Sequence, residues 1–190
     1  MKTRHMLFCI TCLFTSIFTL SCNKNNMSIL IEDKTKEPNG GFEYAKDGIP
    51  LNWQVYTSQT TPNGDFEVLL DRINFKEGEQ SLNFVVRNCS PTGGWHSPGI
   101  AKQIDAKPGE KYRISFWVKN SGSTFRALVS GISATKGESA TIVMTGDEIP
   151  EWKQYTYSYV VPDKMNALRF EVNVLQAGTF WIDDVRIAKE

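Results

Sequence analysis

The chain contains 190 residues, in which 21 lysines and arginines balance 21 aspartates and glutamates, so its formal net charge is zero. This balance argues against a nucleic-acid partner, because the chain has neither a basic field nor a charged tail that would bind one. Two histidines and four cysteines also leave little material for a zinc site or a catalytic triad.

The first 22 residues have the layout of a secretory signal. Lys2 and Arg4 precede an apolar run over residues 6–20. That run is too short for a permanent transmembrane helix, which needs ~20 apolar residues. Because the segment ends Leu-Ser-Cys, it resembles the bacterial lipobox, which implies cleavage before Cys22 and acylation of its sulfur. We therefore predict a signal peptide over residues 1–21 and a lipidated Cys22. The alternative is an ordinary secretion signal with a chance cysteine.

The predicted anchor places the protein in the bacterial cell envelope, at the outer membrane. Surface-export signals of Bacteroidota lipoproteins carry acidic residues directly after the cysteine. Residues 23–26 read Asn-Lys-Asn-Asn and lack them. The sequence therefore leaves both the periplasmic and the outward-facing alternatives open.

Cleavage would change the chemistry available to the mature chain. Cys9, Cys12 and His5 would be removed with the signal, and Cys22 would be acylated. Only Cys89 and His96 would remain, so an intrachain disulfide is excluded, and one residue of each type argues against a Cys/His zinc site. A Ser-His or Cys-His nucleophile would have to use His96.

The mature chain is predicted to have two parts. Residues 22–37 are polar and alternate in charge, which favours a flexible tether, although Ile29–Ile31 could form an extra edge strand. Residues 38–190 are long enough for one domain of ordinary size.

Within that domain, apolar and polar residues alternate with a period of two, which is typical of half-buried strands. The clearest runs cover residues 82–87, 112–119, 168–174 and 181–187, with further runs at 51–57, 66–70, 99–104, 125–132, 140–144 and 152–160. Clusters of Gly, Pro, Asn and Ser separate them. About ten short strands without a sustained helical period predict an all-β, antiparallel β-sandwich.

Several short motifs occur in a recognisable order. They are Asn-Gly-Gly-Phe-Glu at 39–43, Pro-Leu-Asn-Trp at 50–53, Gly-Glu-Gln-Ser-Leu at 78–82, Trp95, Lys-Pro-Gly-Glu-Lys-Tyr at 107–112, Trp-Lys-Gln-Tyr at 152–155 and Trp-Ile-Asp-Asp-Val at 181–185. Over residues 38–187 this order resembles a carbohydrate-binding module of the family 4/9/22 type. The resemblance implies a galactose-binding-like jelly roll with a glycan cleft on its concave sheet. It does not fix the ligand, because this fold carries many functions.

The last predicted strand carries a carboxylate that needs a partner. Asp183 shares the period-two face of Trp181 and Val185, which we expect to be the core face. An inward carboxylate is costly unless it is paired or binds a metal. The resemblance implies a structural calcium ion held by Glu43 with Asp183 or Asp184, and oxygen ligands suit Ca²⁺. The alternative is that these carboxylates are hydrogen-bonded end groups with no ion.

Outward aromatic and polar residues are the candidate sugar ligands, because sugar rings stack on aromatic planes and their hydroxyls need polar partners. The candidates are Trp117 and Arg113 on one strand, Arg169, Glu171 and Asn173 on another, and Trp95 beside His96 in a Gly-rich loop. The resemblance places both strands in the concave sheet. We therefore expect Trp117 to stand beside Arg169, unless a loop covers it.

Three functions fit these observations. The first is a non-catalytic lipoprotein that binds an oligo- or polysaccharide through a monomeric domain. The second is a structural or protein-interaction lipoprotein whose jelly roll has no glycan site. The third is a glycan-cleaving enzyme, which commonly needs two carboxylates ~5–9.5 Å apart. Glu171 is the only candidate acid in the expected cleft, so no catalytic residue is predicted.

The anchor prediction can be tested directly. Replacing Cys22 by Ala should release the protein from the membrane fraction or leave it unprocessed, because stable retention depends on acyl chains. Membrane fractionation and the intact mass of the product measure this. A variant with the wild-type mass and the wild-type membrane fraction would show that Cys22 is not the anchor.

Overall fold

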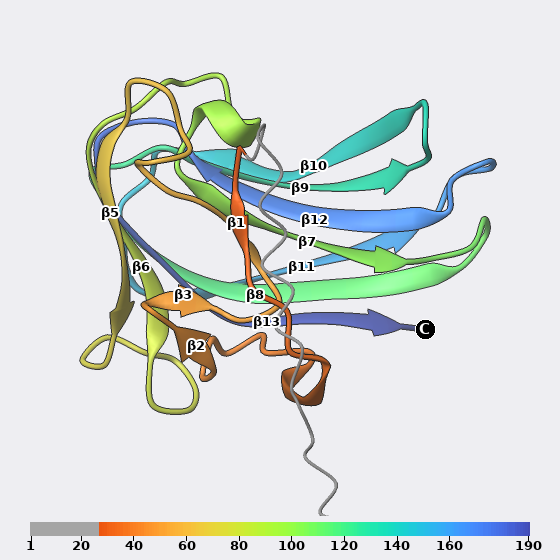
Figure 1. The fold of residues 1–190 in the computed structure, drawn as a ribbon, viewed down its shortest axis with the longest axis horizontal. Helices are drawn as coiled ribbons and strands as arrows, with labels where there is room; N and C mark the ends of the chain where they lie inside the picture. The colour runs from red at the N-terminus through yellow and green to blue at the C-terminus, as the bar shows by residue number, and fades with distance from the viewer. Residues whose placement is uncertain (1–26) are drawn as a thin grey trace, which may run out of the picture.

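The computed structural model describes residues 27–190, so the predicted signal peptide and Cys22 lie outside the described residues. Two antiparallel sheets pack face to face (Figure 1). The six-stranded sheet has the order β1 (Ile29–Leu30), β4 (Gln54–Tyr56), β7 (Gly99–Asp105), β12 (Ala167–Val174), β9 (Phe125–Ile132) and β10 (Gly137–Thr145). The five-stranded sheet has the order β11 (Ile149–Val160), β8 (Lys111–Ser121), β13 (Gly178–Lys189), β6 (Ser81–Asn88) and β5 (Asp65–Asp71). The predicted antiparallel β-sandwich is confirmed.

Smaller elements complete the fold. A two-stranded ribbon joins β2 (Ala45–Lys46) to β3 (Ile49–Pro50). Two 3₁₀ turns, η1 (Lys34–Lys36) and η2 (Gly94–His96), lie before β2 and between β6 and β7.

Aromatic side chains from both sheets form the core. The ring centroids of Phe116 on β8 and Phe170 on β12 lie 5.2 Å apart, and those of Phe125 on β9 and Phe180 on β13 lie 4.7 Å apart. All four side chains are fully buried. Burying a side chain of this size contributes roughly 1.5–3 kcal/mol, so these contacts hold the two sheets together.

A β-bulge in β13 corrects the expected orientation of this strand. The register with β8 shifts between Asp183 and Arg186, and Asp184 has a φ of 46°. Before the bulge, Phe180 and Ile182 enter the core, so Trp181 and Asp183 lie on the outer face of the five-stranded sheet. The prediction of Trp181 in the core was therefore wrong. A bulge changes which residues face inward, and a period-two pattern does not reveal it.

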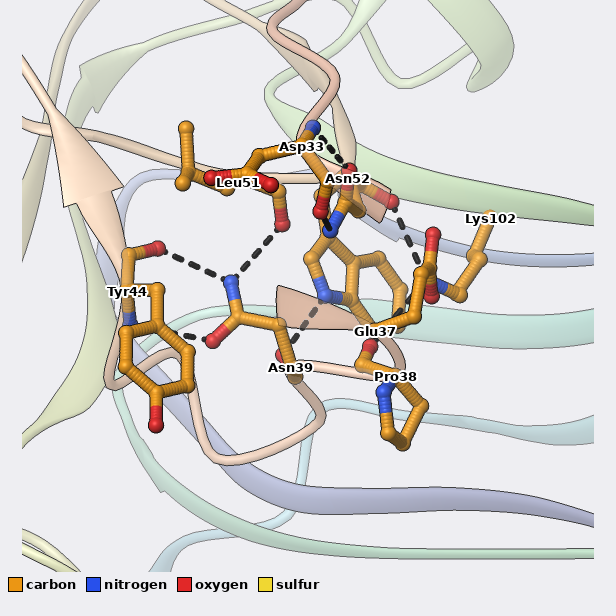
Figure 2. A network of polar contacts seen from close by, with 9 residues as sticks. Asp33, Glu37, Pro38, Asn39, Tyr44, Leu51, Asn52 and Lys102 are labelled. Atoms are coloured by element: carbon orange, nitrogen blue, oxygen red, sulfur yellow. Dashed lines mark hydrogen bonds and ion pairs between the residues drawn. The ribbon is translucent and has the colours of Figure 1, made fainter. Parts of the chain in front are cut away.

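The segment before residue 38 is docked on the domain, which corrects the tether prediction for residues 29–37. Ile29–Leu30 pairs with β4, as the edge-strand alternative suggested. The backbone N–H of Asp33 donates to Asn52 Oδ1 at 2.8 Å, and Asn52 Nδ2 returns a bond to the Asp33 carbonyl at 2.8 Å. The nearly buried Lys102 ammonium pairs with Glu37 at 2.6 Å (Figure 2).

Asn39 links this segment to the core. Its Nδ2 donates to the carbonyls of Tyr44 and Leu51 at 2.9 and 2.7 Å, and its Oδ1 accepts the Tyr44 N–H at 3.0 Å (Figure 2). The indole N–H of Trp53 donates to the Asn39 carbonyl at 2.8 Å. Asn39 has a φ of 48°, a conformation in which Asn is enriched. The Asn39 side chain thus satisfies the backbone polar groups of the turn, and the Asn39 carbonyl helps to position the buried Trp53.

Replacing Asn39 by Ala should lower the free energy of unfolding by about 2–4 kcal/mol. The variant loses the three hydrogen bonds of the Asn39 side chain at a buried site. It also keeps a left-handed backbone that an alanine side chain, unlike asparagine, cannot stabilise by hydrogen bonding. Urea denaturation measures the change. Asn166→Ala is the control, because Asn166 is exposed. Equal stabilities of the two variants would contradict the role given to Asn39.

Candidate functional site

Alternate residues of β12 line the outer face of the six-stranded sheet. Leu168, Phe170 and Val172 are fully buried in the core. The predicted Arg169, Glu171 and Asn173 alternate with them and therefore share the opposite face. The structure brings these three candidates together on one strand.

Trp117 and Arg113 do not belong to this face, which corrects the sequence prediction. Both lie on β8, in the five-stranded sheet. Trp117 faces outward there, with the Lys76 ammonium 4.3 Å from its ring centroid. Arg113 is exposed and pairs with Glu190 at 3.0 Å. The sandwich core thus separates Trp117 from Arg169.

Trp117, Lys119 and Trp181, on the outer face of the five-stranded sheet, contact the loop between β5 and β6 and the end of β5. Besides the contact of Lys76 with the Trp117 ring, the indole N–H of Trp181 donates to Asp71 Oδ2 at 2.8 Å. Lys119 Nζ donates to Asn74 Oδ1 at 3.4 Å. These contacts assign the outer tryptophans a role in ordering the loop, which matches the alternative that a loop covers Trp117.

A polar cluster spans β4 and β12. Arg169 Nη2 donates to Tyr56 Oη at 2.6 Å, and Arg169 Nε donates to Glu171 Oε2 at 3.1 Å. The Tyr56 hydroxyl donates to the same Glu171 oxygen at 3.2 Å. Arg169 Nη1 also donates to Gln54 Oε1. The four side chains therefore hold one another in fixed positions.

Small residues on β7 allow this cluster to form. Ala101 lies between Gln54 of β4 and Glu171 of β12 in the register, and Gly99 lies between Tyr56 and Asn173. A Cβ on Gly99 would stand 2.2 Å from the Val172 carbonyl oxygen, so no larger residue fits there. Because β7 has only small outward groups here, the long side chains of its neighbours meet above it.

The charged and polar groups of the cluster are complementary, since the guanidinium of Arg169 faces the carboxylate of Glu171. Burial, followed by the nearby Glu171 charge, raises the pKa of Tyr56 to about 12, so its hydroxyl remains a hydrogen-bond donor at neutral pH. Glu171 is 8% exposed and its carboxylate is paired with Arg169. The cluster thus offers hydroxyl, amide and guanidinium groups with fixed directions.

The loop that carries Trp95 borders the other end of this face. Asn173 is fully buried; its Oδ1 accepts the Gly94 N–H at 3.0 Å, and its Nδ2 donates to the Gly94 carbonyl at 3.1 Å. The half-buried rings of Trp95 and His96 lie 3.7 Å apart between centroids. The structure therefore places Trp95 in a loop fixed to the same face as Asn173.

A hollow of about 320 Å³ adjoins the cluster at its opposite end. The docked N-terminal segment forms one wall of it with Leu30, Glu32 and Lys34. Gln54 lines both this hollow and the cluster, so the two are continuous. A strand was predicted at residues 51–57, but Gln54 and Tyr56 were not identified as site residues, because their role depends on the register of β4 with β7 and of β7 with β12.

The predicted calcium ligands occupy the other side of the molecule. Asp183 is fully buried: Oδ2 accepts the N–H groups of Lys76 and Glu77 at 2.7 and 3.1 Å, and Oδ1 accepts that of Asp184 at 2.7 Å. Burial outweighs these bonds and raises the pKa of Asp183 to about 6. Glu43 Oε1 accepts one N–H, from Glu79, at 3.0 Å.

Two of the three carboxylates lie close to Gly41. A Cβ on Gly41 would lie 3.7 Å from Glu43 Oε1 and 3.9 Å from Asp183 Oδ1. Asp184 instead pairs with Arg186 at 2.6 Å. No group of three or more His, Cys, Asp or Glu residues with metal-site geometry occurs in residues 27–190. The carboxylate oxygens of Glu43 and Asp183 are of the kind that a hard cation binds, and backbone carbonyls or water would have to complete its shell.

A family model described as a carbohydrate binding domain matches residues 38–178. A search of curated proteins found no match. Among solved structures, the chain is similar to the CBM22-1 xylan-binding domain of Paenibacillus barcinonensis Xyn10C, with 14% identity, a TM-score of 0.57, and coverage of 79% of this chain and 91% of that chain. It is also similar to TmCBM61 in complex with β-1,4-galactotriose, with 22% identity, a TM-score of 0.55, and coverage of 80% and 97%.

Another similar structure contains the CBM22-1 and GH10 modules of Clostridium thermocellum xylanase 10B complexed with xylohexaose. The identity is 19% and the TM-score 0.56, over 73% of this chain and 26% of that chain. This chain therefore spans about a quarter of that two-module structure. At these identities the likeness shows the fold, a jelly-roll β-sandwich.

Proposed function

Because this chain belongs to the carbohydrate-binding domain family, we propose that the outer face of its six-stranded sheet binds an oligo- or polysaccharide without cleaving it. The observation that carries this proposal is the cluster of Gln54, Tyr56, Arg169 and Glu171 over the small residues of β7. Sugar hydroxyls both donate and accept, and this cluster offers both kinds of group in fixed positions.

The surroundings of the cluster support the same proposal. Trp95 supplies an aromatic group in the bordering loop, and aromatic planes stack on the C–H faces of sugars. The hollow beside Gln54 extends the face beyond the cluster. A hydrated sugar exchanges water bonds for protein bonds, so affinities on the order of micromolar to millimolar are expected.

The arrangement of carboxylates favours binding over cleavage. Glu171 is held by Arg169 and Tyr56. Asp105, the acid that β7 contributes to this face, lies four residues from the β7 partner of Glu171, roughly 13 Å along the strand. That separation exceeds the ~5–9.5 Å between the two acids of most glycoside hydrolases.

The cellular setting of the proposal rests on the sequence. The Leu-Ser-Cys ending of the signal segment supports a lipid anchor at Cys22 and a place in the bacterial outer membrane. Among the described residues, none of the helices is long and apolar enough to cross a membrane. A structural or protein-interaction lipoprotein remains the second function, and it would be favoured if no glycan binds.

Replacing Tyr56 by Phe should weaken glycan binding about fivefold, because one neutral hydrogen bond contributes about 1 kcal/mol. Affinity electrophoresis against a panel of soluble polysaccharides, followed by calorimetry on the best ligand, measures this. Tyr44→Phe is the matched control, since Tyr44 is exposed on the segment before β2.

Trp117→Ala serves as a second comparison, because Trp117 lies on the opposite sheet and should not alter the affinity. A chain that binds no polysaccharide of the panel would contradict the proposed function. A loss of binding with Trp117→Ala alone would move the site to the five-stranded sheet.

We further propose that Glu43 and Asp183 hold a structural calcium ion, as the resemblance implies. If so, a chelator should lower the melting temperature of calcium-loaded protein, since an ion that binds only the folded state stabilises it by ~2.7 kcal/mol at a hundredfold excess over Kd. Glu43→Gln should abolish most of this difference, whereas Glu151→Gln, at an exposed position of β11, should not. Identical melting curves with and without chelator, in protein with measured calcium content, would refute the site.

A further inference from the structure

Arg126 lies on the proposed binding face and is absent from the cluster already described. It is the register partner of Asn173 on one side and of Met144 on the other, so its side chain shares the outer face of the six-stranded sheet. Arg126 Nη2 donates to Asn173 Oδ1 at 3.3 Å. Arg169 is four residues from Asn173 on β12, so the two guanidinium groups lie on strand positions roughly 13 Å apart.

The charge of Arg126 is not compensated within residues 27–190. Four described arginines, Arg87, Arg113, Arg169 and Arg186, form ion pairs with carboxylates. Arg126 forms none with a described residue, and its Nε is buried without a hydrogen-bond partner among them. Glu171, the acid of the neighbouring strand on this face, pairs with Arg169 and so does not neutralise Arg126.

The guanidinium of Arg126 is also held in position. Gly93 has a φ of 84°, and a Cβ there would lie 1.9 Å from Arg126 Nη2. The loop backbone therefore packs directly on the guanidinium, which Asn173 contacts from β12. Trp95 follows two residues later in the same loop. A charged fork and an aromatic ring thus stand at the same end of the face.

We infer that this end of the face selects acidic sugars, with the Arg126 guanidinium binding the carboxylate of a uronic acid residue. The inference rests on the proposed glycan binding. A guanidinium matches a carboxylate through two parallel N–H···O bonds, and hydrogen bonds between charged groups are stronger than neutral ones. Met144, exposed next to Arg126, and Trp95 provide apolar contacts for the sugar ring.

The test compares two polymers that differ only at C6 of the sugar, where one carries a carboxylate and the other a hydroxymethyl group. Calorimetry on the full-length chain, purified in detergent, measures binding of polygalacturonate and of its carboxyl-reduced form. Wild-type protein should bind the acidic polymer about tenfold or more tightly than the reduced one. This ratio should fall in 0.5 M NaCl, because salt screens the charges. A sulfated galactan separates recognition of a carboxylate from recognition of any anion on a sugar.

Arg126→Gln should reduce the ratio to near one, and Arg126→Lys should keep part of it. Arg113→Gln, which removes an exposed charge from the opposite sheet, should leave the ratio unchanged. Melting curves of each variant verify that it is folded.

Several results would overturn the inference. Equal affinity of wild-type protein for the two polymers, an unchanged ratio in folded Arg126→Gln, or tighter binding of the sulfated galactan than of polygalacturonate would each contradict uronate recognition, while glycan binding itself stands. Absence of binding to every polymer tested would instead overturn the proposed function, and this inference with it.

Discussion

A carboxylate without access to water must find its hydrogen bonds inside the protein, and Asp183 finds them in three backbone N–H groups. Two of these belong to the β5–β6 loop, which connects neighbouring strands of one sheet. The third belongs to Asp184, where the left-handed backbone begins the bulge of β13. That bulge lets Val185 enter the core and lets its N–H bond to the Gly40 carbonyl at 2.9 Å. The β5–β6 loop, the bulge of β13 and the contact of Val185 with Gly40 therefore all depend on the buried carboxylate of Asp183.

The opposite sheet solves a different problem, that of holding long polar side chains over a closely packed core. Ala101 is fully buried beneath its neighbours, so the side chains of β4 and β12 form the outer layer of the sheet at this point. Arg169 bonds to three partners, which fixes a side chain that would otherwise be mobile in the unbound protein. Side chains ordered before a ligand arrives reduce the entropy lost on binding. If this face binds a glycan as proposed, its rigidity lowers the entropy lost on binding.

The alternation of residues in the sequence predicted most of the strands correctly, because one face of each strand must be apolar. It also predicted that Trp117 and Arg169 face outward. It could not predict their sheet, since a period of two reports the orientation of a side chain and carries no information on strand neighbours. Trp117 was therefore placed beside residues from which the core separates it.

Two other features left no local signal. The bulge at Asp184 depends on contacts with a loop more than 100 residues earlier in the chain. The strand that carries Tyr56 was predicted, but the role of Tyr56 appears only through the register of β4 with β7 and of β7 with β12. Conversely, the order of short motifs over residues 38–187 identified the family, because turns and strand starts are specified by local residues.

The pairing of Ile29–Leu30 with β4 limits how far the binding face can travel from a membrane. If the chain is held by lipid at Cys22 as proposed, seven residue steps separate the bilayer surface from the edge of the six-stranded sheet. A fully extended chain spans at most ~3.3–3.6 Å per residue, so the segment from Cys22 to Ile29 reaches about 25 Å. Gln54 sits on the strand next to that edge. The edge of the six-stranded sheet would then stay within about 25 Å of the bilayer, and the domain would meet only polymer that lies close to its own membrane.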